Sequence, residues 1–365
     1  MSDPIFILAG GATGGHLCPG IAVADALVEA QPSARVVFAC ADRPTDHAFL
    51  DELGYGMVVQ PVRPLPRRLR DVGRFWSGWR RSRRIARDLV ADVQPAAVLG
   101  LGGYAAGPVV REAARAVVAT ALLNPDAVPG KANRYLARRV DAIFTQFPET
   151  AETFGARQRP KIHCVGCPVR RFEPTDPASA RKHFGLDPDK KVLLVLGGSL
   201  GALSVNRAVD AAAPQLAQLA PAWQLLHLTG GKVDNCEAFG QMHVVRLGFC
   251  DRMDLAYAAA DMVLSRGGAS TLAELADRKL PAAVMPYPYH RDMQQKHNGA
   301  ALARAGAAVL IDDAVKPQPN AEAIKRILLP VLRDPEKLAQ MKRNAATLAD
   351  RSAAAAVAEW MLSRR

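Results

Sequence analysis

The chain repeats one pattern of hydrophobic and polar positions, in which a short apolar run leads through glycines into apolar positions at helical spacing. Residues 5–9 (IFILA) begin the pattern, which continues through the glycine-rich stretch 10–16 and becomes helical over 17–30. Residues 191–198 (KVLLVLGG) begin it again, and residues 261–265 (DMVLS) begin it a third time. Strands that alternate with helices in this way predict parallel α/β sheets, whose ligands bind at the carboxyl ends of the strands.

The length of the chain and the restart of the pattern near residue 191 predict two Rossmann-like, doubly wound domains that face each other across a cleft. The first domain is expected over residues 1–170 and the second over residues 191–345. Residues 171–190 are rich in proline, aspartate and lysine and are expected to be the linker. The alanine-rich residues 346–365 predict a C-terminal helix that packs back on the N-terminal domain.

The charge of the chain indicates an anionic partner. Lysine and arginine total 47 against 35 acidic residues, which gives a net charge of +12. No apolar run approaches the roughly 20 residues that a membrane-spanning helix needs. The first apolar run has no basic segment before it, so we expect a strand there and not a signal peptide. Six cysteines without framework spacing indicate free thiols in a reducing cytoplasm.

Residues 63–87 form a basic segment in which ten arginines stand against a single acidic residue. Its apolar residues with helical spacing include Leu69, Phe75, Trp76 and Trp79. A basic helix with aromatic side chains suits a membrane surface, where arginines contact lipid phosphates. Nucleic acid would satisfy the same charges, and a solvated face over an ordinary core stripe is a further alternative. The two tryptophans favour the membrane surface.

The stretch after residue 265 has the features of an anion-binding and sugar-binding site. Gly267 and Gly268 allow a turn into a helix, whose first N–H groups and dipole favour a diphosphate. Glu274, expected in the first turn, is placed to accept the two hydroxyls of a ribose. The alternative is a capping box in Thr271-x-x-Glu274, which needs no ligand. The adjacent amides of Gln294 and Gln295 suit the hydroxyls of a sugar, because an amide both donates and accepts.

The first glycine-rich loop lacks the Gly-Lys-Ser/Thr of a phosphate-binding loop. It nearly meets the dinucleotide fingerprint, with Gly10, Ala12 and Gly15 in the three glycine places and Asp42 as the ribose acid, so a nicotinamide enzyme stays an alternative. His16 closes the loop. A histidine there can take a proton from a hydroxyl nucleophile, whereas the alternative is a helix-entry histidine that bonds only backbone.

Several motifs occur in a specific order across nearly the whole chain. They are GGATGGH (10–16), GGYAAGP (102–108), AVPGKANR (127–134), PVR (168–170), GGSLGALSVN (197–206), RGGASTLAE (266–274) and DMQQ (292–295). In these residues the chain resembles the MurG family of GT-B glycosyltransferases, the UDP-N-acetylglucosamine:lipid I transferases of peptidoglycan synthesis. The resemblance implies two Rossmann-like domains, of which the C-terminal one mainly holds the donor nucleotide.

The resemblance also implies roles for individual residues. Arg170, Phe249 and Cys250 would line the uracil, Ser199 would touch the diphosphate, and Glu274 would take the ribose diol. Gln294 and Gln295 would grip the sugar, while Thr13, Gly14, Gly15 and His16 would face the reaction centre. The remaining residues implied to bind substrate are Tyr104, Asn124, Asp126, Asn206, Ala269, Ser270, Thr271, Leu272 and Ala273.

The chain departs from the family pattern before the AVPG motif. Where the family has His-Glu-Gln-Asn, this chain has Leu123-Asn124-Pro125-Asp126. Asn124 therefore replaces the carboxylate of the second position, and Asp126 replaces an asparagine expected to meet the transferred sugar. Smaller departures are Ala12 for a glycine, Ala106 for a serine and Cys167 for an asparagine. The change at residues 123–126 puts in doubt a catalytic role for the family's glutamate here, because Asn124 stands in its place. It does not affect the nucleotide site.

The resemblance implies an inverting transfer of N-acetylglucosamine to the muramoyl 4-hydroxyl of lipid I, with His16 as base, at the cytoplasmic face of the bacterial inner membrane. The expected partners are UDP-N-acetylglucosamine, lipid I, anionic phospholipid and other cell-wall synthesis proteins, without nucleic acid. No cofactor is implied, and the absence of an acidic metal cluster from the sequence predicts activity without a divalent metal. The alternatives are a transferase or epimerase that uses the same donor on another substrate, and a catalytically silent, membrane-docked binding subunit.

Overall fold

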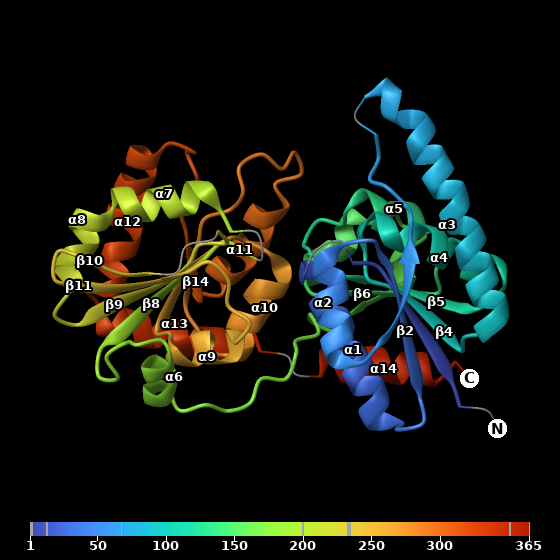
Figure 1. Cartoon of the computed structure of the whole chain (residues 1–365), viewed down its shortest axis with the longest axis horizontal. Helices are drawn as coiled ribbons and strands as arrows, with labels where there is room; N and C mark the ends of the chain where they lie inside the picture. The colour runs from blue at the N-terminus through green and yellow to red at the C-terminus, as the bar shows by residue number, and fades with distance from the viewer. Residues whose placement is uncertain are drawn as a thin grey trace. The chain divides into compact units, whose positions relative to one another are not determined.

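The computed structural model divides the chain into two compact units, residues 1–170 with 350–365 (unit 1) and residues 171–349 (unit 2). The structure describes residues 3–11, 14–66, 68–198, 201–231, 235–349 and 352–364. Each unit is a twisted, largely parallel sheet covered by helices (Figure 1). The predicted fold class, two Rossmann-like α/β domains, is confirmed.

The sheet of unit 1 has the strand order β3-β2-β1-β4-β5-β6-β7, and all its pairs are parallel. The strands are β1 Ile5–Ala9, β2 Arg35–Ala41, β3 Gly56–Gln60, β4 Ala97–Gly100, β5 Ala119–Asn124, β6 Ala142–Thr145 and β7 Ile162–Cys164. Successive side chains of β1 enter different cores, because side chains alternate between the two faces of a strand. Phe6 and Leu8 enter one core, and Ile7 and Ala9 enter the other.

The helices of unit 1 cover both faces of this sheet. They are α1 Gly14–Ala30, α2 Pro44–Leu53, α3 Val72–Val93, α4 Gly103–Arg115, α5 Lys131–Leu136 and α14 Ala353–Leu362, with short 3₁₀ turns at Leu69–Asp71, Pro148–Thr153 and Arg159–Lys161. The C-terminal helix α14 packs beside α1 (Figure 1). Val357, Ala358 and Met361 join Phe6 and Leu8 in one core, so the last helix of the chain completes the first unit.

The sheet of unit 2 has the order β10-β11-β9-β8-β12-β13-β14, and only β10 runs antiparallel to its neighbour in the described pairs. The strands are β8 Lys191–Leu196, β9 Trp223–Leu228, β10 Asn235–Phe239, β11 Met242–Leu247, β12 Met262–Ser265, β13 Ala282–Val284 and β14 Ala308–Leu310. The helices are α6 Pro177–His183, α7 Leu203–Ala211, α8 Ala213–Leu216, α9 Met253–Ala259, α10 Ala269–Asp277, α11 Gln294–Arg304, α12 Pro317–Leu332 and α13 Pro335–Ala346, with a 3₁₀ turn at Ala217–Leu219.

The segment expected to be a linker, residues 171–190, instead begins unit 2 and contains α6. Asp176 caps this helix, because its carboxylate accepts a hydrogen bond from Ser179 N at 2.9 Å. Ala180 of α6 packs against Leu255 and Ala259 of α9. The Pro and Asp residues therefore mark a helix start and not an extended connection.

Glycines bring the backbone close together at the carboxyl ends of the strands in unit 2. A Cβ on Gly201 would lie 2.1 Å from Thr229 O, and a Cβ on Gly267 would lie 2.2 Å from Gln295 O. Only glycine permits either approach. In the described ranges, no helix combines the length and the apolar character needed to cross a membrane.

Candidate functional site

The first turn of α1 places His16 against the loop that follows β4. A Cβ on Gly102 would lie 3.1 Å from His16 Nδ1, and Gly102 has a φ of +97°, so this contact needs glycine. Burial lowers the pKa of His16, while the charge of Asp126, a backbone contact with Leu101 and the charge of Asp46 act in the opposite direction. The net lowering leaves the imidazole neutral near pH 7, the form in which it accepts a proton.

Asn124 and Asp126 lie at the carboxyl end of β5. Asn124 is 1% exposed, its Nδ2 donates to Asp126 O at 2.7 Å, and its Oδ1 accepts from Asn133 Nδ2 at 2.9 Å. The amide of Asn124 thus shapes the loop and is not presented to a ligand. The prediction that Asn124 binds substrate with its side chain has no support in this geometry, whereas Asp126 stays close enough to influence His16.

Tyr104 lies in the first turn of α4. Its hydroxyl accepts a hydrogen bond from Arg43 Nη2 at 3.1 Å, and its ring packs on a small core of Ala41, Val62 and Ala105. Asp42, the ribose acid of the nicotinamide alternative, is an exposed side chain that contacts His47 at 3.1 Å. Thr13 lies outside the described residues, while Gly14 and Gly15 begin α1.

The basic segment 63–87 forms a 3₁₀ turn and most of α3. Leu69 is 92% exposed and Trp76 is 51% exposed, whereas Phe75 is partly buried and stacks on Trp79. Trp79 was predicted to face the membrane, but its ring covers Gly107 of α4 and packs on the core around Tyr104. The indole of Trp79 occupies the space that a side chain at position 107 would fill, so this partly buried ring packs α3 against α4.

In unit 2 the turn after β12 leads into α10, which begins at Ala269 with Gly268 as its N-cap. The predicted start at Ser270–Thr271 is therefore late, and Glu274 lies in the second turn. No side-chain cap is present, so the capping-box alternative is wrong. Glu274 is 7% exposed, and its Oε2 accepts a hydrogen bond from Tyr257 OH at 2.7 Å. A buried carboxylate that a tyrosine holds in place, in the helix that follows β12, is suited to binding hydroxyls.

The first residues of α10 differ in what they can offer a ligand. By helix geometry, the N–H groups of Ala269, Ser270 and Thr271 lack intrahelical acceptors. Leu272 N already donates to Gly268 O at 3.0 Å, and its side chain is fully buried. Ala273 is also buried, so the predicted contacts of Leu272 and Ala273 with substrate are not supported by their position.

The amide of Asn206, a partly buried residue of α7, makes hydrogen bonds inside unit 2. Its Nδ2 donates to Thr229 O at 2.8 Å, and its Oδ1 lies 3.0 Å from His227 Nε2. Burial, with the charge of Arg246, lowers the pKa of His227 to about 4, so the neutral ring donates to Asn206. Asn206 thus fastens α7 to the end of β9, and its contact with substrate stays a prediction. Ser199 lies outside the described residues.

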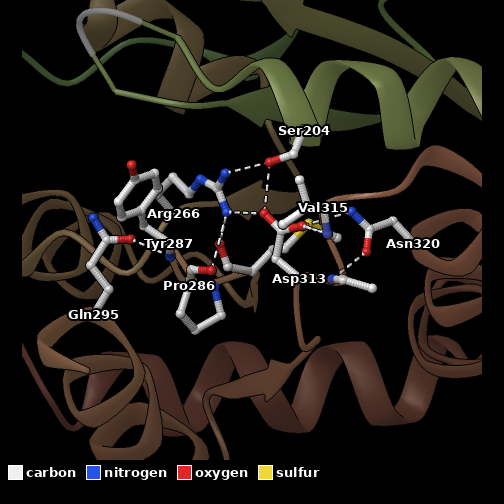
Figure 2. A network of polar contacts seen from close by, with 10 residues as sticks. Ser204, Arg266, Pro286, Tyr287, Gln295, Asp313, Val315 and Asn320 are labelled. Atoms are coloured by element: carbon white, nitrogen blue, oxygen red, sulfur yellow. Dashed lines mark hydrogen bonds and ion pairs between the residues drawn. The ribbon is translucent and has the colours of Figure 1, made fainter. Parts of the chain in front are cut away.

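Gln294 and Gln295 are the first two residues of α11. Gln295 Oε1 accepts a hydrogen bond from Tyr287 N at 2.8 Å (Figure 2). Its Nε2 group remains a donor for a ligand. Asn298 Nδ2 donates to Gly267 O at 3.0 Å, which ties the start of α11 to the turn before α10.

The residues expected around the uracil belong to different units. Phe249 is 66% exposed and follows β11 with Cys250, whose thiol has its pKa raised to about 11 by burial. Arg170 is the last residue of the first part of unit 1, and it is partly buried. Within the part of the chain that the structure describes, no three His, Cys, Asp or Glu side chains gather as a metal site.

Four residues of unit 2 had no role in the prediction from sequence. Tyr257 holds Glu274, and Ser204, Arg266 and Asp313 form a polar network (Figure 2). Arg266 begins the RGGASTLAE motif, but the sequence predicted no function for this residue. The partners lie 47 and 62 residues away from it, so no local pattern could have joined them.

Two family profiles match this chain. The Glycosyltransferase family 28 N-terminal domain matches residues 5–145, and the Glycosyltransferase family 28 C-terminal domain matches residues 192–357. The chain belongs to glycosyltransferase family 28. This membership agrees with the resemblance seen in the motifs, and it sets aside the nicotinamide alternative.

Proteins similar to this family 28 chain support the same assignment. The UDP-N-acetylglucosamine–N-acetylmuramyl-(pentapeptide) pyrophosphoryl-undecaprenol N-acetylglucosamine transferase of Leifsonia xyli subsp. xyli is 38% identical, over 94% of this chain and 94% of the relative. The protein of that name from Carboxydothermus hydrogenoformans is 34% identical over 93% and 92%. The crystal structure of Acinetobacter baumannii MurG has the same fold, with a TM-score of 0.73, 24% identity and 99% of each chain covered.

Proposed function

We propose that this glycosyltransferase moves N-acetylglucosamine from UDP-N-acetylglucosamine to the muramoyl 4-hydroxyl of lipid I and so forms lipid II. The observation that carries the proposal is the similarity, over nearly the whole length, to relatives whose name is that of this transferase. The site in unit 2 supports it, because a glycine turn, a helix start and a buried carboxylate occur together at the carboxyl edge of the sheet.

The proposed mechanism gives His16 the role of general base. The neutral imidazole removes the proton of the acceptor hydroxyl as that oxygen attacks the anomeric carbon and the bond to UDP breaks. Charge then develops on the diphosphate, and the starts of α7 and α10 stabilise it with N–H groups and helix dipoles. Glu274 accepts the ribose hydroxyls, while Gln294 and Gln295 hold the sugar. All of the steps use groups of the protein and need no cofactor.

The proposal is tested by UDP release from UDP-N-acetylglucosamine in EDTA, with and without a short-chain lipid I analogue. We expect release that depends on the acceptor, and a β-linked disaccharide product. Donor binding without this release would contradict the acceptor assignment. It would favour a second candidate, a transferase or epimerase of the same fold with another substrate, for which the altered residues Leu123–Asp126 are the observation in favour.

Replacing Tyr257 with phenylalanine is expected to weaken UDP binding by roughly five- to twentyfold. The phenylalanine keeps the ring packing on Phe172 and removes the hydrogen bond from Tyr257 OH to Glu274 Oε2, and one hydrogen bond to a charged group contributes about 1.5–3 kcal/mol at most. Titration calorimetry with UDP and 2′-deoxy-UDP measures the effect. The preference for UDP should fall, because Glu274 is then less well fixed for the ribose diol.

An unchanged preference in the Tyr257→Phe variant would contradict a ribose contact through Glu274. Tyr55→Phe is the matched control, since Tyr55 also donates to a carboxylate, that of Asp25, but in unit 1. The control should bind UDP as the parent protein does.

We also propose that unit 1 docks on the cytoplasmic face of the inner membrane. The support is the basic segment 63–87, with Leu69 and Trp76 exposed among its arginines. The same proposal includes binding to other cell-wall synthesis proteins at the membrane and a role for the enzyme in cell shape and cell division.

The double variant Leu69→Ser with Trp76→Ala is expected to lose most of its binding to anionic vesicles, because two exposed apolar anchors are removed and the arginines remain. Sedimentation with phosphatidylglycerol vesicles measures it, and Leu203→Ser, at a 64% exposed leucine of unit 2, is the control. Parent-like sedimentation of the double variant would move the docking surface elsewhere. Trp79→Ala is not informative here, because the partly buried Trp79 ring packs against Gly107 and a small core of unit 1, and its loss would also change that packing.

A further inference from the structure

Arg266 is a buried arginine whose guanidinium is held almost entirely by the protein. It is 8% exposed, and its Nη1 donates to Met285 O at 2.8 Å, Pro286 O at 3.1 Å and Asp313 Oδ2 at 2.8 Å. Its Nη2 donates to Ser204 Oγ at 2.7 Å (Figure 2). The charge of Arg266 is therefore already balanced inside unit 2, and the residue is not a free cation for a phosphate.

Asp313 is fixed as firmly as Arg266. Its side chain is fully buried, and Oδ2 also accepts from Ser204 Oγ at 2.6 Å. Oδ1 accepts from Val315 N at 2.7 Å and from Asn320 Nδ2 at 2.8 Å (Figure 2). Burial alone would raise the pKa of Asp313, but the hydrogen bonds from Ser204, Asn320 and Arg266 outweigh it and lower the pKa. The pair is thus ionised in the folded protein.

The members of this network follow four strands that are neighbours in the sheet, in the order β8, β12, β13 and β14. Ser204 lies in the first turn of α7, after β8, and Arg266 directly follows β12. Met285 and Pro286 follow β13, and Asp313 follows β14. We call Ser204, Arg266 and Asp313 the strand-end cluster. It joins α7 to the turn that begins α10.

Both helix starts follow glycines, which leave the backbone free to approach a ligand but do not hold it in place. The N–H groups of α7 and α10 stabilise one diphosphate only if the two starts keep a fixed separation. We infer that the strand-end cluster is the positioning device that fixes this separation for the donor diphosphate. The inference rests on the proposed function and deepens it.

Ser204 is the residue through which the cluster reaches α7. Its replacement by alanine leaves the ion pair between Arg266 and Asp313, and the hydrogen bonds of Asp313 to Val315 and Asn320, in place. It removes only the two hydrogen bonds that link the pair to α7. Ser204→Ala therefore separates positioning from the stability of the buried pair.

The test compares the full-length parent protein with Ser204→Ala in binding UDP, by calorimetry, and uridine, by NMR titration. We expect the Kd of UDP to rise roughly tenfold, the size of about one charged hydrogen bond, while the Kd of uridine stays unchanged. The KM of the sugar donor should rise and kcat should fall, because the charge that develops on the diphosphate is less well stabilised, while the KM of the acceptor stays unchanged. Ser204→Thr, which keeps a hydroxyl, should restore UDP binding.

Three outcomes would overturn the inference. UDP affinity equal to that of the parent would show that α7 needs no such link, and an equal loss for uridine and UDP would show a general structural effect. A parent protein that binds UDP no more tightly than uridine would refute the proposed diphosphate site itself, and the inference with it. The control is Ser179→Ala, which removes a similar hydroxyl–carboxylate bond of 2.9 Å, to Asp176, from α6.

Discussion

Replacing His16 with alanine is expected to lower kcat by roughly 10²–10⁴-fold while leaving UDP affinity unchanged, because a positioned general base contributes about that much. His16 lies in the first turn of α1, where its imidazole contacts Gly102. The lowered pKa of His16 keeps the ring neutral at neutral pH. Single-turnover rates with a lipid I analogue measure the loss. His47→Ala, at a histidine that also contacts a carboxylate, is the control and should keep the parent rate.

The pH dependence gives this prediction a second readout. A general base works only when deprotonated, so kcat/KM should fall on acidification through a pKa below the ordinary 6.5 of histidine. The charge of Asp126 raises the pKa of His16, and Asp126→Asn should therefore move the acid limb to lower pH. A limb that moves to higher pH, or that persists in His16→Ala, would assign the base to another residue.

Replacing Asp313 with asparagine is expected to destabilise unit 2 by about 3–5 kcal/mol, because it leaves the buried charge of Arg266 without its partner. Hydrogen exchange in peptides that cover β8 and β12 measures the local free energy, which avoids assuming that two units unfold in one step. Asp312→Asn is the matched control. Its ion pair with Lys296 is exposed, so about 0–1 kcal/mol is expected.

The stability difference between the parent and Asp313→Asn should depend on pH. The folded-state pKa of Asp313 is lowered, so its contribution is fully present above the ordinary pKa of aspartate and is lost as pH falls through the lowered value. The difference should therefore shrink on acidification. A difference that is constant with pH, or exchange rates equal to those of the control, would show that the pair contributes little.

An apolar replacement of the pair distinguishes stability from positioning. The double variant Arg266→Met with Asp313→Leu should regain much of the lost stability, since no unpaired charge remains. The double variant should still bind UDP more weakly than the parent protein does, because Ser204 then has no partner that ties α7 to the turn before α10.

Local pattern was enough to predict several parts of the molecule. The apolar runs at residues 5–9 and 191–196 became the central strands β1 and β8, because buried parallel strands are continuously hydrophobic. The glycines at 267 and 268 correctly marked a turn into a helix. The predicted start of α10 at Ser270–Thr271 came one residue late, because the spacing of Thr271 and Glu274 in sequence fits both a capping box and a ligand carboxylate.

The sequence by itself determined the fold class and the family, and it predicted residue types suited to a nucleotide sugar, because alternation, glycine turns and motif order are local properties. Only the tertiary structure decided which polar groups remain for a ligand. Asn124 and Asn206 make internal hydrogen bonds, and Trp79 fills the space over Gly107. Tyr257 of α9 lies 17 residues from Glu274, and Asp313 lies 47 residues from Arg266, so each pair forms only when folding brings distant segments together. Such pairings depend on contacts between distant segments, which no periodicity along the chain encodes.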